Sequence, residues 1–137
     1  MKTRSTWLTL SLALGLAACL STGPTEVAIG TEFELAPNQS AKVIGTNWTV
    51  GFRGVTADTR CPIDRFCLVA GDAGIRIDVF GSNADNPLLL SPNAPNNQWN
   101  DQQFRLRVTE LQPIPSDDQA ISPGDYRVRL VVEALGS

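Results

Sequence analysis

The sequence predicts an all-β fold, an antiparallel β-sandwich of about seven or eight short strands with one disulfide. Apolar residues recur at every second position in several runs, which is typical of strands with one buried face. After residue 25, no run sustains the 3.6-residue period of a helix. Clusters of Gly, Pro, Asn and Asp separate the runs. A single layer would leave its apolar face in water, so two packed sheets are expected, with a small barrel as the alternative.

Residues 1–18 are predicted to be an export signal that lies outside the sandwich. Lys2 and Arg4 precede an apolar run over residues 8–18, about half of the roughly 20 residues that a membrane-spanning helix needs. The segment Leu16-Ala17-Ala18-Cys19 ends this run and resembles the lipobox of bacterial lipoproteins. The resemblance implies cleavage before Cys19 and attachment of a diacylglycerol to its thiol. A plain secreted protein is the alternative.

The lipobox resemblance also implies a location. A lipidated Cys19 would carry two or three acyl chains, and two chains already hold a protein stably on a membrane. Leu20 stands where Asp is the usual signal for inner-membrane retention. An outer-membrane anchor facing the periplasm is therefore expected, or the outer face of the cell membrane in a cell without an outer membrane. Residues 19–25 are predicted to be a lipidated tether, and residues 26–137 the sandwich domain.

Four runs are the clearest strand predictions, because each has an apolar face opposite a polar one. The apolar faces comprise Trp48, Val50 and Phe52; Ile75, Ile77 and Val79; Phe104, Leu106 and Val108; and Tyr126, Val128, Leu130 and Val132. Weaker strand predictions cover residues 31–35, 39–44, 67–70 and 88–90. Turn-forming residues such as Gly81-Ser82-Asn83 lie between the runs.

Charge and composition exclude several functional classes. Residues 19–137 hold nine Lys and Arg, all except Lys2 and Arg4, against 14 Asp and Glu, a net charge of −5. Nucleic-acid binders need a basic patch, so no nucleic-acid partner is predicted. The chain contains no His, which excludes Ser-His-Asp and Cys-His catalytic sets and disfavours a zinc enzyme. No catalytic residue, metal or cofactor is predicted.

Cys61 and Cys67 are the only thiols beyond Cys19. In an oxidising compartment an isolated pair most simply forms a disulfide, here closing a seven-residue loop that would contribute about 2 kcal/mol. The alternative is a redox role, because Arg60 and Arg65 flank the cysteines and could lower the pKa of a thiol. The spacing is not Cys-x-x-Cys and no helix is predicted to start there, so a structural bridge is favoured.

The segment around the two cysteines carries a distinctive motif. It reads Asp58-Thr59-Arg60-Cys61-Pro62, then Cys67, then Ala70-Gly71-Asp72-Ala73. This resembles the Asp-Ser-Arg-Cys-Pro…Cys…Trp-Ala-Gly-x-Ala pattern of a family of small, uncharacterised bacterial lipoproteins, with Thr59 in place of Ser and Val69 in place of Trp. Residues 111–115 are similar to a later segment of that family. The resemblance implies the same architecture and disulfide, and it implies no activity.

Four arginines are predicted to share the outer face of one sheet. They occupy the polar positions of two successive strands, with Arg53 and Arg76 as further candidates: Arg105, Arg107, Arg127 and Arg129. Arginine binds carboxylate and phosphate by two-point contacts, so this face could hold lipid headgroups, lipopolysaccharide phosphates or an acidic partner. The alternative is a solvated face on which Asp78 and Glu133 form cross-strand ion pairs.

The polar loop over residues 91–103 is the second candidate surface. Trp99 lies among amide side chains there, a composition that suits stacking on a sugar ring, with peptidoglycan as the obvious glycan. The alternative is that Trp99 folds back to cover the core of the sandwich.

Acidic residues around the cysteine loop are the third candidate. Asp58, Asp64, Asp72 and Asp78 do not match a calcium-binding loop, and Asp58 and Asp72 are expected instead to cap turns or to pair with Arg60 and Arg65. Glycoside hydrolysis by a carboxylate pair is a further alternative, although the sequence fixes no carboxylate separation.

These features favour a non-catalytic binding or structural module of the cell envelope, with an envelope protein or a glycan as its partner. One alternative is an inhibitor of secreted proteases that inserts loops 58–67, 91–103 and 112–125 into an active-site cleft, by analogy with other small exported sandwiches. The other is an envelope enzyme or a thiol redox protein, against which the absence of His counts.

Overall fold

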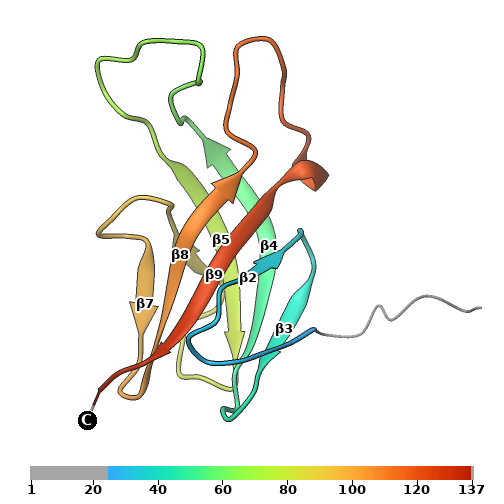
Figure 1. The fold of residues 1–137 in the computed structure, drawn as a ribbon, viewed down its shortest axis with the longest axis vertical. Coiled ribbons are helices and arrows are strands. Elements are labelled where there is room, and N and C mark those ends of the chain that lie inside the picture. The colour runs from blue at the N-terminus through green and yellow to red at the C-terminus, as the bar shows by residue number, and fades with distance from the viewer. Residues whose placement is uncertain (1–24, 137) are drawn as a thin grey trace, which may run out of the picture.

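The computed structural model describes residues 25–136, which form two β-sheets packed face to face (Figure 1). The first sheet has the strand order β1-β3-β4-β5-β6 and the second has the order β2-β9-β8-β7. Neighbouring strands are antiparallel except β1 and β3, which are parallel. The strands are β1 (Thr25–Val27), β2 (Phe33–Leu35), β3 (Ser40–Val43), β4 (Thr49–Asp58), β5 (Ala73–Phe80), β6 (Leu88–Leu90), β7 (Gln98–Asn100), β8 (Phe104–Gln112) and β9 (Arg127–Ala134). A short 3-10 helix, η1 (Pro123–Asp125), precedes β9.

The core lies between the sheets and is built mainly by the four longest strands. In β4 and β5, Val50 pairs with Val79 and Phe52 with Ile77, and all four side chains are buried. The facing sheet supplies the second half of the core from Leu106, Val108, Leu111, Val128, Leu130 and Val132. Alternation of apolar and polar residues along each strand therefore sends one face inward, as the sequence predicts.

The four clearest strand predictions are confirmed, and three of the four weaker ones correspond to β2, β3 and β6. The prediction for residues 67–70 is wrong, because Leu68 and Val69 lie in an exposed loop. Two strands of three residues were not predicted: β1, which begins one residue before the expected domain boundary, and β7, inside the expected loop 91–103. The expected signal peptide and Cys19 lie outside the described residues.

Three connections open at the same end of the sandwich. They join β4 to β5 (residues 59–72), β6 to β7 (residues 91–97) and β8 to β9 (residues 113–126), and together they are called the loop end. In Figure 1 the first and third rise above the strands at the top of the view. Asn93 donates a hydrogen bond to the carbonyl of Gly71, and Arg60 donates one to the carbonyl of Pro113, so hydrogen bonds link all three connections.

Candidate functional site

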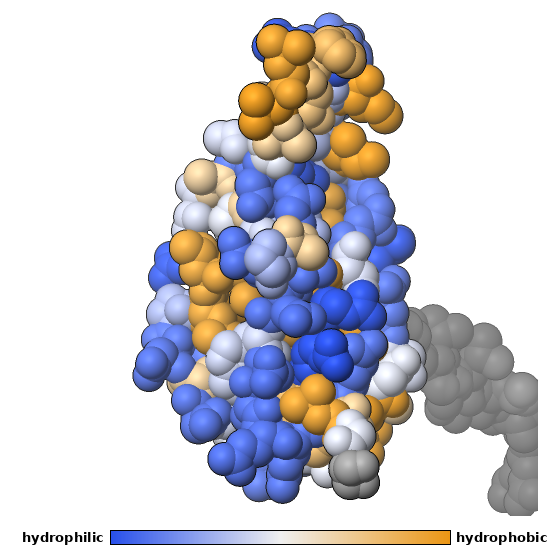
Figure 2. All heavy atoms as spheres, turned by 90° about the vertical axis from the view of Figure 1, so that its left-hand side faces the viewer, coloured by the Kyte–Doolittle hydropathy of each residue, from blue (hydrophilic) through white to orange (hydrophobic). Residues whose placement is uncertain are grey.

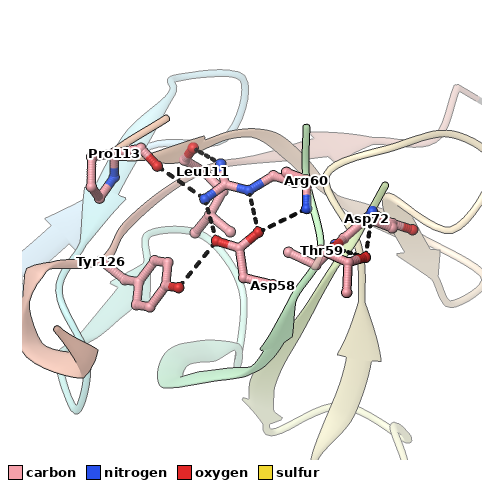
Figure 3. Close-up of polar contacts among 8 residues, drawn as sticks. Asp58, Thr59, Arg60, Asp72, Leu111, Pro113 and Tyr126 are labelled. Atoms are coloured by element: carbon pink, nitrogen blue, oxygen red, sulfur yellow. Dashed lines mark hydrogen bonds and ion pairs between the residues drawn. The ribbon is translucent and has the colours of Figure 1, made fainter. Parts of the chain in front are cut away.

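An ion pair between Asp58 and Arg60 forms the base of the loop end (Figure 3). Asp58 is the last residue of β4, and its Oδ1 accepts hydrogen bonds from Arg60 Nε at 2.8 Å and from the Arg60 backbone N–H at 3.2 Å. Arg60 Nη2 reaches Asp58 Oδ2 at 2.7 Å. Both side chains are nearly buried, with exposed fractions of 11% and 13%. The two-point contact fixes where the chain leaves β4.

Arg60 also joins this loop to the β8–β9 connection. Its Nη1 donates to the carbonyl of Leu111 at 2.7 Å, and its Nη2 donates to the carbonyl of Pro113 at 2.9 Å. The Tyr126 hydroxyl, just before β9, donates to Asp58 Oδ2 at 3.0 Å. One guanidinium and one carboxylate thus hold three segments that are far apart in the sequence, as Figure 3 shows.

The ion pair perturbs the ionisation of its members. Burial raises the pKa of Asp58, but hydrogen bonds from the side chain and backbone of Arg60, its charge and the Tyr126 hydroxyl together outweigh burial and hold the pKa below its usual value. Burial and the bond to Asp58 raise the pKa of Tyr126. Asp58 therefore remains a carboxylate and Tyr126 a phenol at neutral pH. The group is satisfied internally, which favours a structural role over acid–base chemistry.

The two legs of the 59–72 loop meet immediately beyond this pair. Thr59 and Asp72 exchange backbone and hydroxyl hydrogen bonds of 2.7 to 3.1 Å. Gly71 lies so close to the opposite leg that a Cβ atom would stand 1.5 Å from the carbonyl oxygen of Thr59. Only glycine allows the legs to approach this closely without a backbone shift. The motif residues Thr59, Gly71 and Asp72 therefore close the loop at its base.

The outer part of the loop is braced by covalent and polar contacts. Cys61 and Cys67 form the predicted disulfide, with their Cα atoms 6.0 Å apart. The Ile63 N–H donates to the Pro115 carbonyl at 2.8 Å. Arg65 pairs with Asp117 at 3.0 Å, and the Asp117 N–H donates to the Asp64 carboxylate. The 59–72 and 113–126 connections therefore support each other along their length.

These braced loops carry a group of exposed apolar side chains, which we call the apolar tip. Its members are largely in solvent: Ile63 (73%), Phe66 (89%), Leu68 (93%), Val69 (81%) and Ile114 (52%). Figure 2 shows hydrophobic surface gathered at this end of the molecule. Single exposed apolar residues are ordinary on proteins, but a cluster at the end of two braced loops makes the apolar tip a candidate interaction surface.

The surroundings of the apolar tip are acidic. Within the loop end, Arg60 and Arg65 are the two cationic side chains, and both are already paired with carboxylates. Four further carboxylates form no ion pair with a described residue: Asp64, Asp72, Asp118 and Asp125. The loop end thus combines a hydrophobic tip with a negative potential.

Comparisons of the chain with family models, with curated proteins and with solved structures find no match. The resemblance of the Asp58–Ala73 motif to a lipoprotein family therefore stays a prediction.

The four arginines of the predicted anion-binding face do lie together on the outer face of β8 and β9. Glutamates are interleaved with them. Arg107 and Arg105 contact Glu133 at 2.9 and 3.8 Å, and Arg129 contacts Glu110 at 2.7 Å and Glu34 at 3.3 Å. Arg127 donates to the carbonyls of Gly124 and Tyr126. Three of the four arginines are paired with glutamates within the sheet, so the cross-strand alternative describes most of this face better than an anion site.

The expectation that Arg53 and Arg76 belong to the same face is wrong, because β4 and β5 are in the other sheet. Arg53 there forms an ion pair with Asp78 and stacks on Phe80. The alternation of apolar and polar residues in the sequence did not indicate this, since the partition of strands between two sheets is a tertiary property.

Trp99 faces the core from β7 rather than projecting from a loop. Its ring centroid lies 5.5 Å from that of Trp48, and Trp48 in turn contacts Phe104 edge-on at 5.4 Å. The side chain is half-buried against the core. The indole thus covers one side of the sandwich, and the arrangement favours the core-capping alternative over a sugar-stacking surface.

The acidic residues near the cysteines do not converge. Asp58 pairs with Arg60, and Asp72 Oδ1 accepts from the Ala73 N–H, in line with the expected pairing and turn-capping roles, whereas Arg65 pairs with Asp117 instead. Among residues 25–136 no group of three potential metal ligands comes together. No helix in that range is long and apolar enough to cross a membrane.

The apolar tip was missed by the sequence analysis. Its signal was present in Phe66, Leu68 and Val69, three large apolar residues next to Cys67, but Phe66 was predicted to lie in the disulfide loop, and Leu68 and Val69 in a strand over residues 67–70. Apolarity alone does not distinguish residues buried within the fold from residues exposed on its surface.

Proposed function

We propose that the chain is a lipid-anchored protein of the bacterial envelope whose sandwich is non-catalytic and binds a partner protein through the apolar tip. The observation that carries this proposal is the combination of exposure and bracing in the tip. Phe66 and Leu68 are about nine-tenths exposed while the loops around them are fixed by a disulfide, an ion pair and hydrogen bonds. Apolar residues on braced loops bind at low entropic cost, because the loops lose little conformational freedom on association.

A protein fits the tip better than a lipid bilayer. Envelope membranes carry anionic lipids that attract basic segments, and the unpaired carboxylates Asp64 and Asp118 near the tip would be repelled by them. A protein surface with an apolar depression and basic surroundings complements both the hydrophobicity and the charge of the loop end.

An inhibitor of secreted proteases is the second candidate. The three segments predicted as wedge loops all contribute residues to the loop end, although residues 98–100 of the second form β7, and hydrogen bonds from Arg60 and Asn93 link them. A convex, rigid tip made of several loops suits insertion into an active-site cleft. This candidate differs from the first only in the identity of the partner.

The binding proposal is tested by replacing Phe66 with a photoreactive phenylalanine analogue in the full-length protein of the native cell. The expected result is a discrete adduct with one envelope protein, which is then identified, purified and titrated against the unmodified protein. The double variant Phe66→Ser/Leu68→Ser should weaken that affinity by about tenfold or more, because anchors of this kind dominate interfaces. Ile44→Ser, an exposed apolar residue in the β3–β4 turn at the opposite end, is the matched control.

Equal affinity of the double variant and the native protein would overturn the tip as the binding surface. Saturable binding to phospholipid vesicles, lost in the same variant, would assign the tip to a membrane instead. The protease candidate is settled by assaying purified secreted serine, cysteine and metalloproteases, and it ends if micromolar protein inhibits none of them.

The anchor is tested separately by growing cells with an alkyne analogue of palmitate. The full chain should incorporate the label and sediment with membranes, and Cys19→Ser should lose both properties. Unlabelled, freely soluble protein with an intact Cys19 would contradict the lipid anchor while leaving the binding proposal open to its own test.

A further inference from the structure

A hollow of about 330 Å³ opens beside the base of the 59–72 loop, on the outer side of the first sheet. Ala57, Gly74 and Leu89 provide apolar lining, and Thr59, Asp72 and Asn96 provide polar lining. Ala57 pairs with Gly74 across β4 and β5, and a Cβ atom on Gly74 would stand 2.3 Å from the Thr56 hydroxyl oxygen and 3.5 Å from Leu89 Cδ1. The Thr56 hydroxyl therefore lies close to Gly74, and Ala57 and Leu89 provide the exposed apolar surface. The volume lies at the low end of the range for ligand pockets and suits a single side chain.

Asp72 gives this hollow its charge. Its Oδ1 accepts hydrogen bonds from the Ala73 N–H at 2.8 Å and from Asn93 Nδ2 at 3.1 Å, which fix the orientation of the carboxylate. Its Oδ2 accepts no hydrogen bond from residues 25–136, and the carboxylate forms no ion pair within that range. Figure 3 shows the Asp72 side chain directed away from the Asp58–Arg60 pair. A held carboxylate with a free oxygen therefore adjoins an apolar surface.

We infer that this hollow receives one lysine or arginine side chain of the partner protein, an inference that rests on the proposed function. The aliphatic stem of either residue would lie on Ala57 and Leu89, and its cationic head would reach Asp72 Oδ2. An ordinary interface covers about 800 Å² on each partner, enough to extend from the apolar tip to the base of the same loop. The acidic loop end would also draw a basic partner toward the site.

The probe is n-butylammonium, an isolated cation on an aliphatic stem, with n-butanol as its uncharged match. Both are titrated into the full-length protein in non-ionic detergent while backbone amide signals are followed by NMR. Butylammonium should produce saturable shifts at residues 72–74 and 89 in the millimolar range, with much smaller shifts from butanol. Asp72→Asn keeps an oxygen for the turn and should weaken butylammonium binding by about fivefold without changing the butanol shifts. Asp85→Asn, an exposed acid outside the hollow, should have no effect.

Leu89→Ser tests the apolar half of the site. Leu89 lies in β6 and takes no part in the turn that Asp72 caps, so this variant leaves that turn unchanged. It should also weaken butylammonium binding. Equal shifts from butanol and butylammonium, or unchanged binding in Asp72→Asn, would overturn the inference. If butylammonium fails to bind while the Phe66→Ser/Leu68→Ser variant still loses its partner, only this inference fails. If butylammonium binds while that variant keeps its partner, the proposed function fails.

Discussion

Asp58 and Arg60 form a two-point ion pair although only one residue separates them in the chain. Most residues of the distinctive motif around them also help to fix the 59–72 loop. Thr59 and Asp72 close the two legs of the loop, Gly71 permits their approach, and Cys61 with Cys67 closes the outer part. The motif that attracts attention in the sequence is thus a scaffold. The residues available to a partner, Phe66, Leu68 and Val69, lie between its fixed parts.

Removing the guanidinium should destabilise the fold strongly. Arg60→Ala leaves the nearly buried Asp58 carboxylate without its counter-charge and frees the carbonyls of Leu111 and Pro113. We expect the free energy of unfolding to fall by about 3 kcal/mol, measured by urea denaturation. Arg65→Ala is the control, because the Arg65–Asp117 pair is exposed and should contribute under about 1 kcal/mol. Equal losses in the two variants would contradict the central role of Arg60.

The Asp58–Tyr126 hydrogen bond should make stability depend on acid pH. Because the pKa of Asp58 is lowered in the folded state, its ionised form stabilises the fold above the unfolded value of about 3.9, and this contribution is lost as pH falls through the lowered folded value. Tyr126→Phe should cost about 1.5 kcal/mol at pH 7 and clearly less at pH 2. Glu133, whose pKa is lowered by its hydrogen bond from Arg107, contributes equally to both proteins and cancels in the difference. A cost that does not change with pH would contradict this coupling.

Reduction of the disulfide should loosen the tip without unfolding the sandwich. In the chain-entropy account, a seven-residue loop gives a bridge worth about 2 kcal/mol, and Cys61→Ser/Cys67→Ser should lose that amount. The base contacts of Arg60 and Gly71 do not involve either sulfur, so amide exchange should accelerate in residues 61–69 and stay unchanged in β4 and β5. Global unfolding of the double variant would show that the bridge supports more than the loop.

The long strands could be predicted because apolar and polar residues alternate along each of them, which indicates a buried face. β5 and β9 alternate over most of their length, and β4 and β8 alternate up to Phe52 and Val108, after which a β-bulge shifts the pattern. The three-residue strands β1 and β7 carry too few positions for such a pattern. β1 is a strand because it pairs with β3, and β7 because Trp99 lies opposite Leu106. Such pairing depends on neighbours that sequence periodicity does not reveal.

The contacts of the candidate site likewise divide into those that are local in the sequence, which could be predicted, and those that are distant in it, which could not. The Asp58–Arg60 pair and the disulfide are local in the chain and were anticipated. The contacts of Arg60 with Leu111 and of Asp58 with Tyr126 span 51 and 68 residues, and no local pattern indicates them. Leu68 and Val69 were placed in a strand because apolar residues are usually covered by their own chain.

The arginine face should not bind anionic membranes. Arg129 contacts both Glu34 and Glu110, and Glu133 contacts both Arg105 and Arg107, so among the four arginines of this face Arg127 alone pairs with no carboxylate of residues 25–136. Replacing all four arginines of that face by glutamine should leave binding to anionic vesicles at low salt unchanged. Each exposed pair lost should cost under about 1 kcal/mol of stability. A large fall in vesicle binding would restore the anion-binding hypothesis.

Gly71 provides the sharpest test of the loop base. A methyl group there would stand 1.5 Å from the Thr59 carbonyl oxygen, which is backbone and cannot turn aside, so Gly71→Ala must separate the two legs. We expect a loss of at least about 2 kcal/mol in unfolding free energy, with altered amide shifts at Thr59 and Asp72. Gly124→Ala is the matched control, since a Cβ atom there would meet nothing within 4 Å. Its stability should stay within about 0.5 kcal/mol of the native protein. If Gly71→Ala behaves like Gly124→Ala, the close approach of the two legs does not determine the geometry on which the apolar tip depends.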